Sequence, residues 1–343
     1  MQRKLLACLL VVGCLLTNGC WLIDKFVRKS VSIPQVLPAD TAELPQLLAE
    51  INRVAAARSI KSKLYLEFED LSDAGAGIAE KYKRADGSVY VQRPGQIYLA
   101  IQGPLSTKIA EMTSDGEGFC VAVYQGAERY RRYVCGRNNS DYSKLQLDDM
   151  ESGQTSDKMM QRDKQRVGVF SKIRPQHFVD GLLLKPIATA QAANQIYVRS
   201  EAKEEEADNR LNAKSGARVV RGYYLLDEIT TNGDGTGQVS RRFWFDRFQG
   251  VHLARVQLFS AEGAMTTDIT YSENKPVGAN GVPMPNRIAI RRPKENYGLT
   301  LTYQEPANVT LDKQFDAGIF VLKNNGLPEV DLEKLKNRKP EER

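Results

Sequence analysis

Cysteine thiols are the side chains of this sequence with the widest range of chemistry, and their positions divide them into two groups. Cys8, Cys14 and Cys20 lie within the first twenty residues, whereas Cys120 and Cys135 are the only two in the body of the 343-residue chain. A thiol can be acylated, oxidised to a disulfide, used as a nucleophile or bound to a metal. The surrounding residues indicate which of these applies to each group.

The first twenty residues have the order of a secretory signal. Arg3 and Lys4 give a positive start, an uncharged and mostly apolar run follows, and Cys20 comes directly after the small Gly19. A small residue followed by cysteine at the end of such a run suggests a bacterial lipoprotein signal, whose cysteine is acylated and becomes the first residue of the mature chain. We therefore predict that residues 1–19 are a lipoprotein signal peptide and that Cys20 is lipidated.

Three alternatives for this segment stay open. The apolar run is shorter than the about 20 residues of a membrane-spanning helix, which argues against a transmembrane anchor. An ordinary cleaved signal without lipid is the second alternative. The third is acylation at Cys14, since Val11-Val12-Gly13-Cys14 fits the lipoprotein pattern better locally than Thr17-Asn18-Gly19-Cys20, although it would halve the apolar run.

Cys120 and Cys135 favour a disulfide. They lie on two runs with strand character, residues 118–124 and 129–135, around a turn at Gly126-Ala127. If the turn centres just after this pair, the two cysteines face each other, and opposed residues of an antiparallel pair lie about 4.5–5.5 Å apart at Cα. Because an exported protein folds in an oxidising compartment, we predict that the two cysteines pair. Two free buried thiols are the alternative.

Groups for catalysis or metal binding are few. The two histidines, His177 and His252, have no obvious nucleophile nearby and lie far from the cysteines in sequence, so we expect no metal site. There is no G-x-S-x-G, no P-loop and no G-x-G-x-x-G after a strand. Asp246-Arg247 is predicted to be an ion pair of a turn. We expect neither enzymatic activity nor a cofactor, and keep an envelope hydrolase as an alternative with no residue to nominate.

The composition is that of a globular protein without a nucleic-acid partner. Hydrophobic residues make up 42% and charged residues 26% of the chain. The net charge of +6 falls to +4 once Arg3 and Lys4 are removed, and the basic residues are interleaved with 42 acidic ones. Nucleic-acid binding is therefore not expected, whereas a weak attraction to anionic lipid headgroups is compatible with this charge.

The period of the apolar residues predicts which elements position these groups. Residues 40–59 repeat apolar side chains at helical spacing, with Asp40 and Glu43 in the form of a capping box. A second helix is expected to begin at Arg174-Pro175, with Pro175 in its first turn. Most other runs alternate with a period of two between turns such as Pro94-Gly95, which predicts an antiparallel meander. About ten strands with two helices make an α+β protein whose sheet curls.

The same pass along the chain predicts its organisation. Residues 20–39 form a tether to the membrane, residues 40–322 form the folded body, and residues 323–343 form a polar tail. The body carries polar insertions near residues 137–167 and 201–214.

Short motifs of the body connect it to a known family. Arg93-Pro94-Gly95-Gln96-Ile97-Tyr98-Leu99, Gly103-Pro104-Leu105 and the stretch from Met112 to Phe119 lie in its first half. Trp244-Phe245-Asp246-Arg247, Tyr271-Ser272 and Pro283-Met284-Pro285 lie in the second. Over roughly residues 60–322 this pattern resembles the superfamily of LolA/LolB-type outer-membrane lipoprotein carriers, although the chain is much longer than typical carriers.

The resemblance implies an incomplete antiparallel β-barrel of about ten to eleven strands, with helices covering its concave apolar face. It also implies a non-enzymatic protein that binds acyl chains of lipoproteins or related lipids. A core filled by its own side chains is the alternative, because periodicity alone does not distinguish it from a cavity. By position, the residues of a lipid-binding cavity would be Leu64, Leu66, Phe68, Val89, Val91, Ile97, Leu99, Ile101, Val121, Phe243, Phe245, Val256, Leu258, Ile288, Ile290, Leu299 and Leu301.

These expectations define one function and one alternative. The first is a lipoprotein anchored by its N-terminal lipid on the periplasmic side of the outer membrane, which binds a lipid or acylated cargo and contributes to lipoprotein localisation. The alternative is a structural or interaction lipoprotein that belongs to an envelope complex and carries no cargo.

Overall fold

The computed structural model describes most of the body of the chain. Its described residues are 33–71, 80–81, 84–126, 128, 131–140, 142, 173–187 and 194–337. The predicted signal peptide, Cys14, Cys20, most of the tether and most of the 137–167 insertion lie outside these residues.

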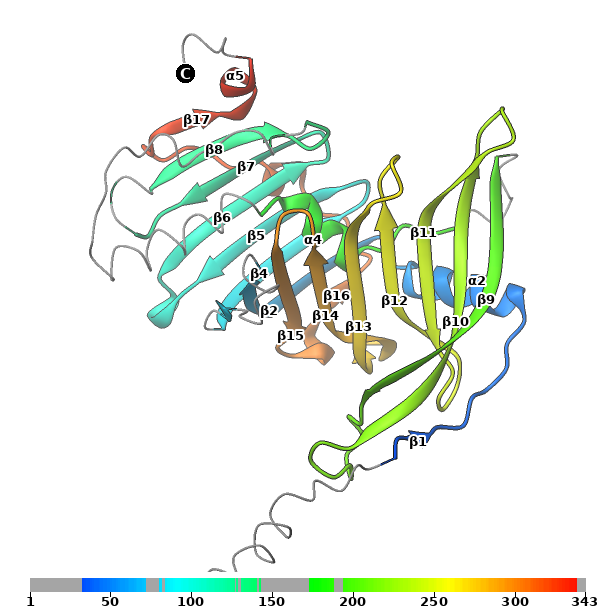
Figure 1. Ribbon diagram of the computed structural model, residues 1–343. Coiled ribbons are helices and arrows are strands. Elements are labelled where there is room, and N and C mark those ends of the chain that lie inside the picture. Colours follow the sequence, from blue (N-terminus) through cyan, green and yellow to red (C-terminus); the bar gives the residue numbers. More distant parts are fainter. Residues whose placement is uncertain are drawn as a thin grey trace, which may run out of the picture.

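Strands of the first half of the chain follow one another across the sheet in sequence order (Figure 1). Neighbours pair antiparallel, as the tight turns between them predict. These strands are β2 (Ser59–Asp70), β4 (Ala85–Gln92), β5 (Gln96–Gln102), β6 (Lys108–Asp115), β7 (Gly118–Val123) and β8 (Arg132–Arg137).

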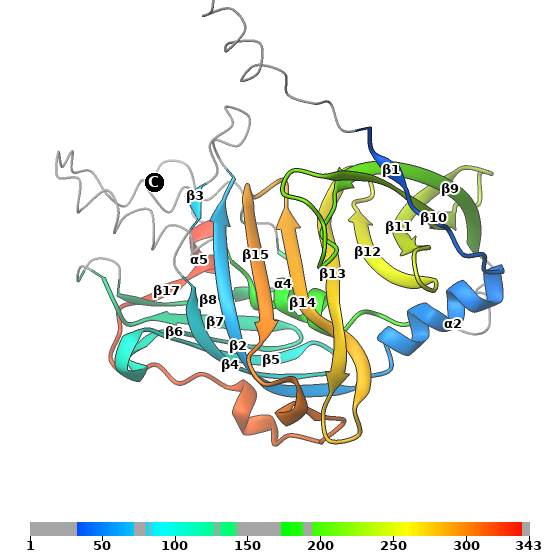
Figure 2. The same ribbon diagram turned by 90° about the horizontal axis from the view of Figure 1, so that it is seen from below.

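The second half forms another antiparallel meander, and β15 joins it to the first by pairing with β2, Leu301 lying opposite Leu66. Figure 2 shows the two halves as one strongly curved sheet. The strands of this half are β9 (Gln195–Ala207), β10 (Arg218–Thr231), β11 (Gly237–Asp246), β12 (His252–Phe259), β13 (Met265–Val277), β14 (Val282–Arg292) and β15 (Tyr297–Tyr303).

Four short strands complete the sheet in the described residues. The sheet then has seventeen strands in the described residues, more than the ten to eleven that we predicted. The four short strands account for part of this excess, because pairings of two or three residues are too short to show a period in the sequence. Two of them pair in parallel, β1 with β10 and β17 with β8. The short strands are β1 (Gln35–Val36), β3 (Glu80–Lys81), β16 (Thr310–Leu311) and β17 (Glu329–Asp331).

Two helices lie on the concave face of the sheet. Helix α2 (Leu44–Val54) is shorter than the predicted 40–59 at both ends. At its start, the Glu43 N–H donates to Gln46 Oε1 (2.7 Å), so the capping residue is Glu43 and not Asp40. At its end, Ser59 already belongs to β2. Helix α4 (Pro175–Leu182) begins at Pro175, as predicted, and a third helix, α5 (Leu332–Lys336), follows β17.

The opposite, convex face of the first half is covered by the C-terminal strap, residues 312–328. Phe315 packs edge-on against Tyr90 (ring centroids 5.3 Å apart), whose neighbours Val89 and Val91 point to the concave side. The Phe315 N–H donates to Gln92 Oε1 (2.8 Å), and the Tyr133 hydroxyl donates to the Leu322 carbonyl (2.6 Å). The strap then leads into β17, which extends the sheet beyond β8.

Candidate functional site

The concave face gathers the residues predicted to line a cavity. Fifteen of the seventeen are buried, and the other two, Phe68 and Leu258, are partly buried against the same cluster. Cross-strand pairs such as Val89 with Leu99, and Leu299 with Phe68, place them in rows across the sheet. The buried ones are Leu64, Leu66, Val89, Val91, Ile97, Leu99, Ile101, Val121, Phe243, Phe245, Val256, Ile288, Ile290, Leu299 and Leu301.

Helix α4 covers the middle of this face. Its Phe178 is fully buried, and its Gly181 lies so close to β14 that a Cβ there would come within 2.5 Å of Ile290 Cδ1. The Tyr271 hydroxyl from β13 donates to the Gly181 carbonyl (3.3 Å). The glycine therefore allows close contact between helix and sheet, and any larger residue requires one of them to move.

Helix α2 covers the second half of the face. Leu47 and Ile51, one turn apart, are fully buried. The Leu253 N–H of β12 donates to Glu50 Oε1 (3.1 Å), and Arg53 Nη1 donates to the Pro283 carbonyl (2.6 Å). Polar contacts at its exposed edge thus fix this helix to two strands of the sheet.

Arg93 connects both helical segments to the sheet. It stands in the turn between β4 and β5 and donates to the carbonyls of Ala55 (3.0 Å), Ala57 (3.2 Å) and Leu184 (2.7 Å). The first two follow α2 and the third follows α4. Partial burial lowers the pKa of Arg93. The sequence marked this residue as part of a motif, but its role as a link between three segments depends on contacts distant in sequence.

A few polar groups interrupt the apolar face beside α4. The Tyr297 hydroxyl of β15 contacts His177 Nδ1, and burial holds the pKa of His177 well below its usual value, with Arg292 and Arg174 adding to this effect. Asp180 Oδ1 accepts a hydrogen bond from Gln176 Nε2 (3.0 Å), and burial raises the pKa of Asp180. We predicted no catalytic role for His177, and its neutral, buried ring has a structural contact here.

Several inner-face residues were missing from the predicted set. All follow from extending the period of two along strands already recognised, since Tyr297 and Tyr303 continue the row of Leu299 and Leu301. The Tyr303 hydroxyl is buried and has no hydrogen-bond partner in the described structure. The additional buried residues of this face include Met112, Leu226, Ile269, Tyr271, Tyr297 and Tyr303.

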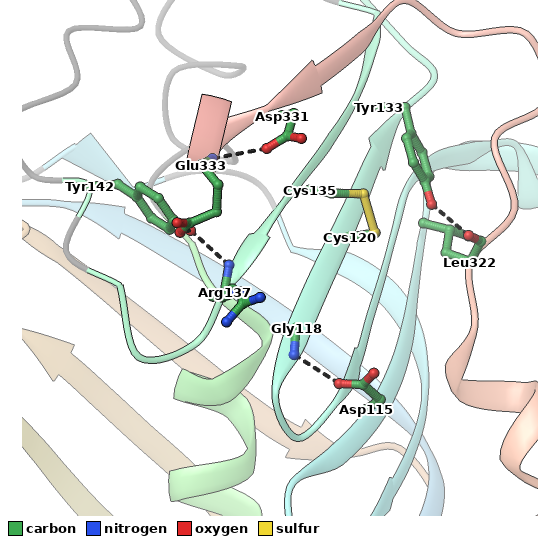
Figure 3. The surroundings of a disulfide bond; sticks show 10 residues. All are labelled: Asp115, Gly118, Cys120, Tyr133, Cys135, Arg137, Tyr142, Leu322, Asp331 and Glu333. Carbon is green, nitrogen blue, oxygen red and sulfur yellow. Dashed lines mark hydrogen bonds between the residues drawn. A yellow bond between two sulfur atoms is a disulfide. The ribbon is translucent and has the colours of Figure 1, made fainter. Parts of the chain in front are cut away.

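The two body cysteines face each other across β7 and β8 (Figure 3). Cys120 pairs with Cys135 in the register predicted from the turn, their Cα atoms lie 4.2 Å apart, and a disulfide joins them. The adjacent turn is closed by Asp115 Oδ1, which accepts from the N–H of Gly118 (2.8 Å). The disulfide ties together the last two long strands of the first half.

The turn after β11 differs from the prediction. Asp246 does not pair with Arg247; it accepts from Arg221 (2.6 Å) and from the Phe248 N–H (2.8 Å). Arg247 instead donates to Glu201 (2.6 Å). Asp246 is the last residue of β11 and Arg247 begins the turn, and each side chain pairs with a residue of a different strand, β10 or β9.

In the described part of the chain, no group of three or more histidine, cysteine, aspartate or glutamate side chains is placed to hold a metal ion. A helix long and apolar enough to cross a membrane is likewise not found within the described ranges.

Comparison with known proteins gives similarity in fold. No family model and no curated protein matches this sequence. Among solved structures, a LolA superfamily protein from Nitrosomonas europaea has a TM-score of 0.40 and 12% identity, covering 82% of this chain and 99% of that chain. A DUF1329 family protein from Desulfovibrio piger has a TM-score of 0.40 and 13% identity, covering 80% and 95%. A proposed outer membrane lipoprotein-sorting protein domain from Vibrio parahaemolyticus has a TM-score of 0.36 and 11% identity, covering 80% of this chain and 96% of that chain.

The function proposed below rests on the protein's own residues.

Proposed function

We propose that this protein is a lipid-anchored lipoprotein of the bacterial envelope that binds a lipid or an acylated cargo against the concave face of its sheet. The observation that carries the proposal is a continuous apolar face on a sheet that does not close, covered by two short helices. The disulfide supports an oxidising compartment such as the periplasm. The proposed role is binding without catalysis.

Cargo reaches this face only if a covering element moves. Helix α4 is the better candidate, because it has eight residues and isolated helices of that length are unstable in water. Its position depends on packing against Ile290 and on the Arg93 contact to Leu184. An acyl chain that took the place of Phe178 would restore the apolar contacts that the helix loses.

Two substitutions on one strand test the face directly. Leu301→Asn changes the inner face of β15, and the matched Thr302→Asn changes its outer face one residue further on. With a fluorescent phospholipid as probe, we expect Leu301→Asn to weaken binding at least several-fold and Thr302→Asn to leave it unchanged. Circular dichroism and thermal unfolding check that each variant folds.

A third variant keeps the test decisive if Leu301→Asn does not fold. Gly181→Ala forces α4 and Ile290 apart by its added methyl group. If cargo replaces α4, this variant loses stability but binds the fluorescent phospholipid more readily. If Gly181→Ala is less stable but neither this variant nor the wild type binds the fluorescent phospholipid, the cargo-binding proposal is refuted.

The burial of the inner face by the protein's own side chains also favours a second function. Since most inner-face residues are already buried by the protein itself, the fold can serve as a solid scaffold for an envelope complex. Native mass spectrometry of membrane-extracted protein separates the two: a co-purifying lipid supports the first function, and a stoichiometric protein partner with no lipid supports the second.

The anchor at Cys20 is tested separately. Acylation of the purified chain, measured by mass spectrometry of the N-terminal peptide, is expected to disappear in Cys20→Ala. A variant that is still acylated would move the anchor to Cys14.

A further inference from the structure

The strands β9 and β10 continue past the end of β11 and form an arm, residues 203–222, that projects from the sheet (Figure 1). β10 pairs with β11 from Tyr223 onward, whereas its pairing with β9 extends back to Arg218 opposite Ala207. These five further residues of β10 correspond to about 15 Å at the usual rise of a strand. The predicted 201–214 insertion is therefore partly regular β structure with a turn at its tip.

The N-terminal end of the described chain is fastened to this arm. Gln35 and Val36 form β1, which pairs in parallel with Val219 and Val220 of β10. The hydrogen bond from Arg210 Nη2 to Gln35 Oε1 (2.8 Å) adds a side-chain contact near the tip. The segment that leads back to Cys20 therefore joins the described body alongside the arm.

Exposed apolar side chains gather at the same place. Of the eight large hydrophobic residues that are exposed in the described structure, three lie on the arm or on the segment fastened to it. Leu211 at the tip is fully exposed, Ile33 is 86% exposed and Val36 is 65% exposed. A single exposed leucine is ordinary, but here three such residues share the place where the tether joins the body.

The charges at the tip of the arm and in the tether suit an anionic surface. Asp208 is neutralised by Arg210 (2.7 Å), and Lys214 is exposed beyond them. In the sequence, the tether between Cys20 and Ile33 contains Lys25, Arg28 and Lys29 against Asp24. Basic residues near an anionic membrane are attracted to its surface.

We propose that the tip of the arm, with Leu211, Ile33 and Val36, rests in the headgroup region of the membrane that carries the lipid of Cys20. The proposal depends on the anchor at Cys20 but not on cargo binding. Burial of one leucine side chain is too little to hold a protein on a membrane alone. On a chain that its lipid already holds at the membrane, however, the same contact forms at a high effective concentration. It is then sufficient to set one orientation of the body.

The test places an environment-sensitive fluorophore at two positions of the acylated full-length mature protein. One is the tip, through Leu211→Cys, and the matched control is Ala261→Cys, an exposed residue in the turn between β12 and β13. The protein is reconstituted into vesicles of phosphatidylethanolamine with a smaller share of phosphatidylglycerol. We expect a blue shift of the emission and quenching by spin-labelled lipid at position 211, and neither at position 261.

Flotation of the vesicles separates failure of this proposal from failure of the anchor. If the protein does not float with the vesicles, the predicted lipid anchor at Cys20 is refuted. If it floats and the label at position 211 stays in water, the proposal for the arm is overturned. Equal quenching at positions 211 and 261 would also overturn it, because it would mean that the body has no fixed orientation on the membrane.

Discussion

The convex faces of the two halves of the sheet are stabilised by different means. In the first half, the aromatic ring of Tyr90 on β4 is covered by Phe315 of the C-terminal strap. In the second half, arginine and carboxylate side chains pair across the strands. Arg242 binds Asp227 with two hydrogen bonds (2.6 and 2.9 Å), and Arg255 binds Asp268 in the same way (2.6 Å each).

The difference shows two solutions to the same problem. A sheet that packs against a core on one face must keep apolar side chains of its other face away from water. It can cover that face with a further layer of chain, or it can place polar and charged side chains there. The strap buries Phe315 and Phe320, so its contribution is mainly hydrophobic. The paired charges are partly exposed, so each contributes little and the sum depends on salt. The two faces should therefore respond differently to substitution.

Truncating the strap should have the largest effect. Phe315→Ala removes a buried aromatic ring, which typically costs about 3–5 kcal/mol of the free energy of unfolding. Chemical denaturation of the purified protein measures this loss. Val321→Ala, at an exposed position of the same strap, is the control and should change stability by less than about 0.5 kcal/mol. A similar small change in both variants would mean that the strap contributes little.

Opening the disulfide should have the next largest effect, and it also acts on the first half. Cys120 and Cys135 are 15 residues apart, and closing a loop of this length stabilises the folded state by about 3 kcal/mol in the chain-entropy model. We expect the double variant Cys120→Ser/Cys135→Ser to lose about this amount in denaturant unfolding. Wild type under reducing conditions should match the variant. Unchanged stability in both experiments would contradict the prediction.

The second half could be predicted from its sequence better than the cover of the first half. The alternation of Leu299 and Leu301 identifies a strand and its inner face, because a period of two follows directly from strand geometry. The strap has no such period. Phe315 lies in an irregular segment, and its burial depends on contact with β4, more than 200 residues earlier in the chain. Such a contact leaves no local signal.

Errors in the predicted elements have similar causes. The run Glu204-Glu205-Glu206 lies in the predicted polar insertion, beyond the strand expected over residues 195–199, but it continues β9, where Glu205 and Glu206 bind Arg218 and Arg221 of β10. Asp40 and Glu43 have the spacing of a capping box, yet Asp40 instead accepts from the Gly250 N–H (2.6 Å) in the turn after β11. In both cases a partner distant in sequence decides the role of the residue.

Measuring stability against pH tests the contact between α4 and the sheet. His177 has a folded-state pKa below the value of about 6.5 expected in the unfolded chain. As the pH falls below about 6.5, the unfolded chain therefore takes up a proton that the folded protein does not. Stability should fall by up to about 1.4 kcal/mol per pH unit until the folded-state pKa is reached.

The variant His177→Gln isolates this effect. Arg174, Arg292 and Tyr297 act on the ring, and they remain in both proteins, as does the buried Asp180 of the same helix. Subtracting the two stability curves therefore removes their shared contribution to a first approximation. The difference should depend on pH only below about 6.5. A difference that is constant from pH 5 to 8 would show that the ring is not buried in its neutral form.

Breaking one charge pair of the second half should have the smallest effect. The Arg242 and Asp227 side chains are 33% and 16% exposed, and partly exposed pairs typically contribute about 0.2–1 kcal/mol. We expect Arg242→Ala to destabilise by this amount at low salt and by less at high salt, because added ions screen the interaction. A double-mutant cycle with Asp227→Ala separates the pair from the loss of the arginine stem. If the coupling reached the size of the Phe315→Ala effect, the convex faces would not differ in the way proposed here, and charge pairing would have to be treated as a main source of stability in the second half.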